Sequence, residues 1–406
     1  SNEGKVEAVN NIYIKAEDSF TSGIIGDDIS INDDILIASA SNLEIEAKND
    51  INNYAIISAY NNITLTSIDG NITNNAGAEL IAKNNDDSVD STMTLNASKG
   101  SINQYSLNSV IIDGNHSINA YNYTNTGRID ISGDLTMNIE NDLINDVGAL
   151  IYSGNNMTLN IVNNLTNNEY ATIYAENDLI IQKYDSSDAN YDVNDNNVNI
   201  IDNIAGTIEV INNITIYADK LNNIGINYDL DDNGFFGYNI NYLVYKGGWG
   251  ENYYNLMNQD EVVSTLRTRQ AKITSSSANI IINNADIHNY SSSITAQGNI
   301  EINNGSLNNE TASILVENLR KKYGKHHTTK SCSGGGLGVS WNCKTNHHYP
   351  TKWYNYEVNV LSKDVANIKA EGDIIVNGVK QVNNGYFNDQ STIETVIYEA
   401  FKLELL

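Results

Sequence analysis

Apolar and polar residues alternate along this chain in short runs. In NLEIEA (42–47) and NITLTS (62–67), Leu and Ile alternate with Glu, Thr and Ser. Such alternation with a period of two predicts short β-strands with one buried face. We expect the Ile, Leu and Val residues to face inward and the Asn, Thr, Ser and Glu residues to face outward. The Asn residues between the runs favour turns, because Asn tolerates left-handed backbone and its amide bonds to nearby backbone groups.

The runs recur at a fixed spacing. Residues 134–155 (DLTMNIENDLINDVGALIYSGN) and 156–177 (NMTLNIVNNLTNNEYATIYAEN) are two copies of one 22-residue unit. A period near 20 residues is typical of repeat architectures in which each coil contacts only its neighbours. The sequence therefore predicts an all-β fold, a right-handed parallel β-helix (β-solenoid). The insertions 84–91 and 183–197, which interrupt the period, are expected to protrude as loops.

The repeat fails in two places, and these failures suggest a domain division. An aromatic-rich break covers 226–272, and a second break covers 318–360. Between and after them the repeat returns at 278–317 and 370–385. We expect a stalk over residues 1–225 and a second region over residues 226–406 that holds both breaks. The tail, residues 391–406, fits either a closing strand pair or a short amphipathic helix.

Composition narrows the function classes. Asp and Glu number 50 against 23 Lys and Arg, which gives a net charge of −27. This charge argues against a general affinity for nucleic acid or for anionic membranes. No apolar run approaches the roughly 18 residues of a membrane-spanning helix. Ser1 begins within a repeat and no signal peptide precedes it, so we expect an internal fragment of a longer protein.

The order strand, A-x-x-x-I-N-N, small residue, strand, A-x-x-N resembles the filamentous haemagglutinin repeat. That repeat builds the stalks of two-partner-secreted adhesins and of CdiA-type contact-dependent growth inhibition proteins. The likeness covers most of 1–220 and 278–317, and it returns at 370–385. The segment YLVYKGGWGENYYN (242–255) resembles the tyrosine-rich junction that precedes the receptor-binding region in CdiA-type proteins. Residues 269–273 (RQAKI) stand where that family often has a serine–proline–alanine run.

This resemblance implies a secreted protein of the bacterial cell surface. It implies a monomeric filament that an outer-membrane transporter partner exports. The partner it then binds would be an outer-surface receptor of a target bacterium, either protein or lipopolysaccharide, in a step of toxin delivery. A host-cell or biofilm adhesin of the same fold remains an alternative, and so does a carbohydrate-active β-helix enzyme.

The second break reverses the charge of the chain. Seven of the 23 basic residues fall within 320–352, and no acid occurs between Glu317 and Glu357. Arg and aromatic residues on a protruding segment are typical of binding hot spots, and basic residues suit an acidic partner such as lipopolysaccharide phosphate or an anionic receptor loop. A basic insertion without a binding role is the alternative. The candidate receptor-binding residues are Arg320, Lys321, Lys322, Lys325, His326, His327, Trp341, Lys344, His347, His348, Tyr349, Trp353 and Tyr354, with Tyr245, Trp249 and Tyr253 from the first break.

Two cysteines, Cys332 and Cys343, lie eleven positions apart within this basic segment. Two His residues flank each of them, and a glycine-rich stretch separates them. For an extracellular chain we expect a disulfide that closes a hairpin. A zinc site of two thiolates and two imidazoles is the alternative, although the spacing matches no standard zinc finger.

Other candidate chemistry is weaker. Residues 229–234 (DLDDNG) fit the first half of a calcium loop, but the twelfth position is Ile240 instead of Glu. The two histidines outside the basic segment, His116 and His288, are isolated from any Ser and Asp with which a catalytic set could be assembled. We therefore expect a binding protein with no catalytic activity, no cofactor and no metal.

Overall fold

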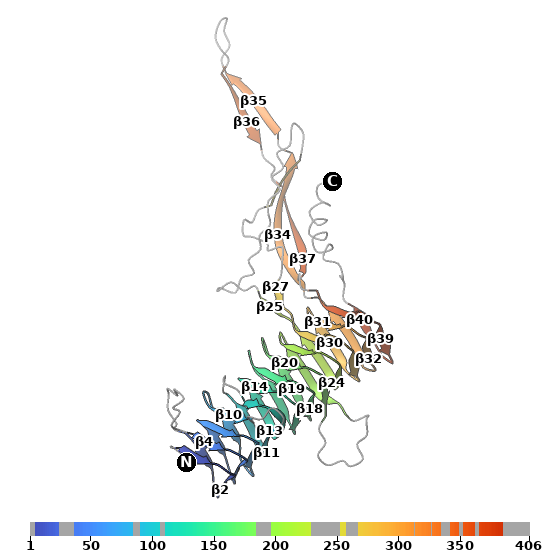
Figure 1. Ribbon diagram of the computed structural model, residues 1–406. Coiled ribbons are helices and arrows are strands. Elements are labelled where there is room, and N and C mark those ends of the chain that lie inside the picture. Colours follow the sequence, from blue (N-terminus) through green and yellow to red (C-terminus); the bar gives the residue numbers. More distant parts are fainter. Residues whose placement is uncertain are drawn as a thin grey trace. The chain divides into compact units, whose positions relative to one another are not determined.

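The computed structural model (Figure 1) describes twelve stretches of the chain. They are residues 5–23, 36–83, 90–105, 110–183, 196–228, 252–256, 267–311, 313–325, 327–333, 342–348, 352–361 and 365–384. Every regular element in these stretches is a β-strand. Most of the predicted loops 84–91 and 183–197, and the whole tail 391–406, lie outside the described residues.

The chain forms two compact units. Unit 1 comprises Ser1–Ile226, Arg269–Thr311 and Ala366–Tyr386. Unit 2 comprises Asn227–Thr268, Ala312–Val365 and Phe387–Leu406. In Figure 1 the strands of unit 1 follow one another in chain order, from blue through green and yellow to red.

One sheet of unit 1 has twelve strands in chain order. They are β1 (Lys5–Ala8), β4 (Leu36–Ser39), β7 (Ile56–Ala59), β10 (Glu79–Ala82), β12 (Val110–Ile112), β14 (Arg128–Ile131), β17 (Leu150–Ser153), β20 (Thr172–Ala175), β23 (Thr207–Val210), β28 (Lys272–Ser275), β31 (Ser293–Ala296) and β38 (Asn367–Ala370). Each strand therefore belongs to a different coil of the chain.

The second set of strands in unit 1 is closed on itself. It contains β2 (Ile12–Ala16), β3 (Phe20–Ser22), β5 (Leu43–Ala47), β6 (Ile51–Asn53), β8 (Asn62–Ser67), β9 (Ile72–Asn74), β11 (Ser91–Gln104), β13 (Gly114–Asn125), β15 (Leu135–Ile139), β16 (Asp142–Asn145), β18 (Met157–Ile161), β19 (Asn164–Asn167), β21 (Leu179–Gln182), β22 (Val198–Ile204), β24 (Ile214–Ile224), β29 (Ile280–Asn283), β30 (Asp286–Tyr290), β32 (Ile300–Asn303), β33 (Ser306–Glu310), β39 (Ile374–Asn377) and β40 (Val382–Asn384). Long strands link its two faces, because β11 pairs with both β8 and β9.

Strand pairing in unit 1 is parallel and joins each coil to the next. Across the doubled unit, Leu135 pairs with Met157 and Ile151 pairs with Ile173. The same register aligns Asn145 with Asn167. The predicted all-β class with parallel strands is thus confirmed.

The core of unit 1 is built from stacked aliphatic side chains. Along β15, Leu135, Met137 and Ile139 are buried while the residues between them are only partly buried. The same alternation recurs in β18 and β20. Burying one such side chain contributes about 1.5–3 kcal/mol, so each coil stabilises the next through several of these contacts.

One Asn in most coils breaks the outward pattern and lies inside the core. Asn125, Asn145, Asn167, Asn203 and Asn223 are each 0% exposed. Each Nδ2 donates to the Oδ1 of the next Asn, at 2.9, 2.9, 2.8 and 2.8 Å along this series. The series continues from Asn223 through Asn289 to Asn309, at 2.7 Å for each step. The prediction that the Asn residues face outward is wrong for this buried asparagine ladder.

The buried asparagine ladder is stable because it also satisfies backbone groups. The Nδ2 of Asn145 donates to the carbonyl oxygen of Thr172 at 3.1 Å, and the Nδ2 of Asn167 donates to that of Thr207 at 3.2 Å. Within one coil, the Oδ1 of Asn125 accepts from the amide of Gly127 at 3.1 Å. Burying a polar amide costs free energy only when its hydrogen bonds are lost, and here they are made.

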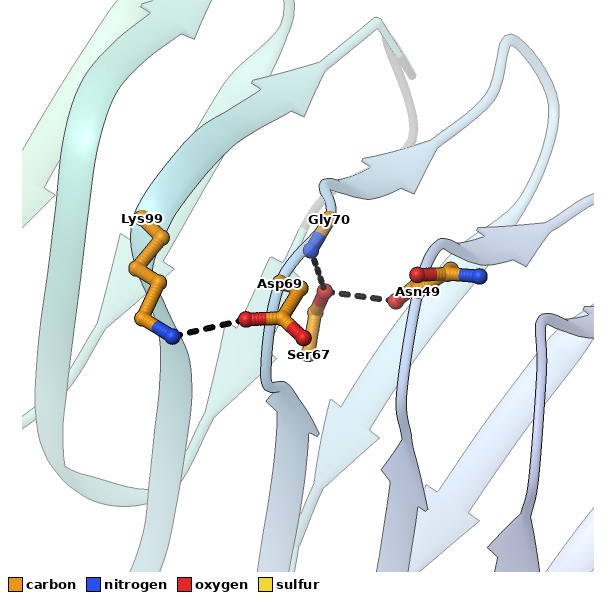
Figure 2. Close-up of polar contacts among 5 residues, drawn as sticks. All are labelled: Asn49, Ser67, Asp69, Gly70 and Lys99. Atoms are coloured by element: carbon orange, nitrogen blue, oxygen red, sulfur yellow. Dashed lines mark hydrogen bonds and ion pairs between the residues drawn. The ribbon is translucent and has the colours of Figure 1, made fainter.

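Serine and glycine shape another corner of the coils, as Figure 2 shows. The Ser67 hydroxyl donates to the carbonyl of Asn49 at 2.6 Å and accepts from the amide of Gly70 at 3.1 Å. At Gly70 a Cβ atom would lie 2.6 Å from the carbonyl carbon of Asn49, so only glycine fits. Nearby, Lys99 bonds to Asp69 on the surface at 2.7 Å.

Unit 2 contains antiparallel strands. β26 (Asn252–Leu256), β34 (Ser313–Lys325) and β37 (Lys352–Leu361) form a three-stranded sheet in the order β26-β34-β37. β35 (His327–Ser333) and β36 (Asn342–His348) form a separate hairpin. At the boundary of the two units, β25 (Ile226–Tyr228) and β27 (Arg267–Arg269) form a two-stranded sheet.

The two main segments of unit 2 replace the same turn of two different coils. In an ordinary coil, a few residues separate the ladder residue Asn145 from strand β17. In one coil, residues 227–268 replace this short turn and follow the ladder residue Asn223. In another coil, residues 312–365 replace it and follow the ladder residue Asn309. Strands β29 to β33 lie within the predicted continuation 278–317, and β39 and β40 lie within 370–385. The division at residue 225 stays a prediction.

We predict that Asn145→Ala lowers the free energy of unfolding by about 2–4 kcal/mol, because it leaves buried amide and carbonyl groups without partners. The measurement is the shift of the urea midpoint. Asn138→Ala is the matched control: Asn138 makes two amide contacts at 2.8 Å in the same coil but is only partly buried. It should cost less than about 1 kcal/mol. Equal losses for the two variants would contradict a special role for the buried ladder.

His116 is a buried residue of a different kind in the core, because it can carry a charge. It lies in β13 between Met93 and Leu135, is 2% exposed, and bonds through Nδ1 to the carbonyl oxygen of Met93 at 2.9 Å. Its Nε2 has no hydrogen-bond partner within the described part of the chain. Burial without a counter-charge lowers the pKa of His116 to about 4.

We therefore predict an acid-sensitive component of stability. Since the pKa of His116 is lower in the folded than in the unfolded state, the unfolded state binds more protons between about pH 6.5 and pH 4. The free energy of unfolding should therefore decrease by about 3 kcal/mol as the pH falls through this window. His116→Met should remove this component, which urea unfolding at pH 7.5, 5.5 and 4.5 would measure. An unchanged pH profile in the variant would contradict the prediction.

Candidate functional site

The structure places the described candidate residues on the strands of unit 2. The candidates of β34 are Arg320, Lys321, Lys322 and Lys325; those of the hairpin are His327, Lys344, His347 and His348; those of β37 are Trp353 and Tyr354; and that of β26 is Tyr253. His326, Trp341, Tyr349, Tyr245 and Trp249 lie outside the described residues. The predicted residues therefore divide between a three-stranded sheet and a hairpin.

In the three-stranded sheet, the register sets basic residues opposite aromatic ones. Lys321 pairs with Tyr354, and Lys322 pairs with Trp353. The two candidate pairs therefore occupy adjacent rows of the strand register.

Sequence reasoning missed a third row of the same kind. Tyr323 of β34 pairs with Tyr254 of β26 on one side and with Lys352 of β37 on the other. None of these three residues was among the candidates. Tyr323 directly follows Lys321 and Lys322 in the sequence, which was a usable signal, but the pairing partners could come only from the structure.

The hairpin of β35 and β36 is exposed throughout its described side chains. Thr329, Lys330 and Ser331 are exposed on one strand, and residues 343–347 are exposed on the other. A hairpin without a buried face has little hydrophobic stabilisation of its own. Its order must come from its backbone ladder and from covalent closure.

That closure is provided at the cysteines. Cys343 is disulfide-bonded, and the chain has one other cysteine, Cys332. The antiparallel register sets Cys332 directly opposite Cys343. By chain-entropy arguments, closing a loop of this length contributes about 2–3 kcal/mol. The hairpin can thus stay ordered while both its faces remain open to a partner.

The charge of the hairpin opposes that of the rest of the chain. Lys330 pairs with Thr345, and Lys344 pairs with Ser331, so the two lysines occupy neighbouring rows on opposite faces. Neither strand contains an acidic residue, whereas the whole chain has a net charge of −27. A positive surface of this kind attracts acidic groups and repels basic ones.

No cluster of three or more His, Cys, Asp or Glu side chains that could hold a metal occurs in the described stretches. The calcium-loop-like residues 229–240 lie outside them. His116 is enclosed by the core and cannot meet a substrate without unfolding. The expected absence of catalysis, cofactor and metal stays a prediction.

Two further findings bear on the identity of the chain. Where the chain is described, it contains no helix of the length and apolarity needed to cross a membrane. Comparison of the chain with protein-family models, with curated proteins and with solved structures found no match. The resemblance to the filamentous haemagglutinin repeat and to CdiA-type proteins therefore rests on the sequence motifs alone.

Proposed function

We propose that this chain is a segment of a secreted bacterial surface filament that binds a receptor on a neighbouring cell. The observation that carries the proposal is the hairpin of β35 and β36. It is exposed, closed by a disulfide and positively charged within an acidic chain. These are properties of a segment that is presented for binding. In the fuller proposal, receptor contact is a step in toxin delivery, as in CdiA-type growth inhibition.

Unit 1 acts in this proposal as the stalk, with the fold of a right-handed parallel β-helix. Parallel pairing between segments one repeat apart supports this assignment, as between Ile139 and Ile161. So does the buried asparagine ladder, which links successive coils along the stack. A rod of this kind resists bending because each coil is bonded to both neighbours.

The partner we propose is acidic and lies on the surface of a target bacterium. Phosphate groups of lipopolysaccharide and an anionic loop of a receptor protein both present the required charge. The basic–aromatic rows Lys321/Tyr354 and Lys322/Trp353 would add contacts of the kind that dominate binding hot spots. We further propose export through an outer-membrane transporter and action as a monomeric filament.

The test compares two charge reversals in a cell-binding assay. The double variant Lys330→Glu/Lys344→Glu changes the hairpin, and Lys48→Glu/Lys220→Glu makes the same change in net charge on two exposed lysines of unit 1. Labelled protein is titrated onto susceptible bacteria, and flow cytometry gives the apparent affinity. We predict a loss of about tenfold or more for the hairpin variant only, since two hot-spot contacts are each worth about 1–2 kcal/mol.

Two results would contradict the proposal. If the hairpin variant binds as tightly as the unchanged protein, the hairpin does not contact the receptor. If both variants lose affinity equally, the effect is one of net charge alone and no particular surface is involved. Adding purified lipopolysaccharide as a competitor then separates the two acidic partners.

A further inference from the structure

Two buried polar atoms without hydrogen-bond partners lie at adjacent positions on the surface of unit 1. The Nε2 atom of His288 in β30 and the Oδ1 atom of Asn308 in β33 are both shielded from solvent, and neither has a hydrogen-bond partner in the described structure. The register pairs His288 directly with Asn308. Orphaned atoms are rare in native proteins, and two that are neighbours call for one shared explanation.

A carboxylate completes this group. The Oε2 atom of Glu310 lies 3.4 Å from the Nε2 atom of His288, without forming a hydrogen bond to it. Glu310 follows Asn308 by two residues in β33, so both occupy the same face of that strand. The side chains of His288 and Glu310 are 36% and 43% exposed, so the site opens to solvent although the His288 Nε2 atom is covered.

We propose that His288, Asn308 and Glu310 form a binding site for a divalent transition-metal ion of the zinc class. Neutral imidazole nitrogen, carboxylate oxygen and amide oxygen are all electron-pair donors, and one cation satisfies the three together. Ligand atoms that each lie about 2.1 Å from a tetrahedral zinc ion are about 3.4 Å apart. That is the separation of the His288 and Glu310 atoms.

The donor set favours zinc over the alkaline-earth ions. Calcium and magnesium prefer sites made wholly of oxygen ligands, whereas imidazole nitrogen suits zinc, cobalt, nickel and copper. The carboxylate of Asp286, two residues before His288 in β30, accepts a hydrogen bond from the Ser306 hydroxyl at 2.8 Å and adds negative charge to the same strand. Tyr290, whose ring centroid is 5.8 Å from that of His288, shields one side.

A protonated His288 paired with Glu310 is the alternative arrangement. It would leave the Asn308 oxygen without a partner, and the contact at 3.4 Å is long for a charge-assisted bond. A metal at this site would also join β30 to β33. Strand β33 ends at Glu310, and the second segment of unit 2 begins at Ala312. Metal binding would thus stabilise the coil from which that segment departs.

The test measures binding of Zn²⁺ alone to the full chain, after removal of any affinity tag and treatment with a chelator. Equilibrium dialysis should show one zinc ion per chain, with a rise in Tm. Co²⁺ as a substitute should give the visible absorption of a four-coordinate ion. His288→Gln and Glu310→Gln should each weaken zinc binding roughly tenfold or more. Asn308→Asp, which adds a charged ligand, should strengthen it.

Glu301→Gln is the matched control for Glu310→Gln, because Glu301 lies in β32, which pairs with β29 and β39 and not with the strands of the proposed site. Circular dichroism would verify that each variant is folded. The proposal is overturned if the unchanged chain takes up no zinc, or if His288→Gln or Glu310→Gln binds zinc as tightly as the Glu301→Gln control does. It is also overturned if Asn308→Asp leaves the affinity unchanged, because a water molecule or an ion pair would then explain the orphaned atoms.

Discussion

The buried asparagine ladder is the constraint on which unit 1 depends. An aliphatic core alone would tolerate small slips between coils, because dispersion and hydrophobic contacts have little directionality. An amide in a dry interior has no such freedom, since its donors and acceptor must meet partners in fixed directions. The bond from Asn145 to Asn167 is made only when the coils are in register. The ladder therefore specifies the stacking that the aliphatic residues stabilise.

The same constraint explains where the chain can accept long insertions. The ladder residue Asn223 and the strand β28 keep their bonds to neighbouring coils although residues 227–268 separate them in sequence. Loop closure costs little more for a long insertion than for a short one. Segments of very different length can therefore occupy this turn while the strand pairing between coils persists.

The sequence predicted the strands and their spacing because both leave local signals. Alternation identifies a strand within five residues, and the identity of Asn145 with Asn167 at a spacing of 22 identifies the repeat. The sequence did not predict that this Asn is buried. An exposed turn Asn and a buried ladder Asn have similar sequence surroundings, and only the contact with the next coil distinguishes them. Thr136 and Asn138, on the outward face of β15, follow the simple pattern.

The candidate site was harder to predict, because its geometry depends on pairing between distant segments. Tyr254 pairs with Tyr323, and Tyr323 pairs with Lys352, only after three strands that are separated in sequence have assembled into one sheet. The orphaned atoms of His288 and Asn308 likewise lie 20 residues apart and meet through the coil period. The repeat brings equivalent positions of successive coils together. A single substitution in one coil can therefore place a new chemical group beside the equivalent residues of the coils before and after it. A stack of similar coils thus acquires new local chemistry where its residues depart from the repeat.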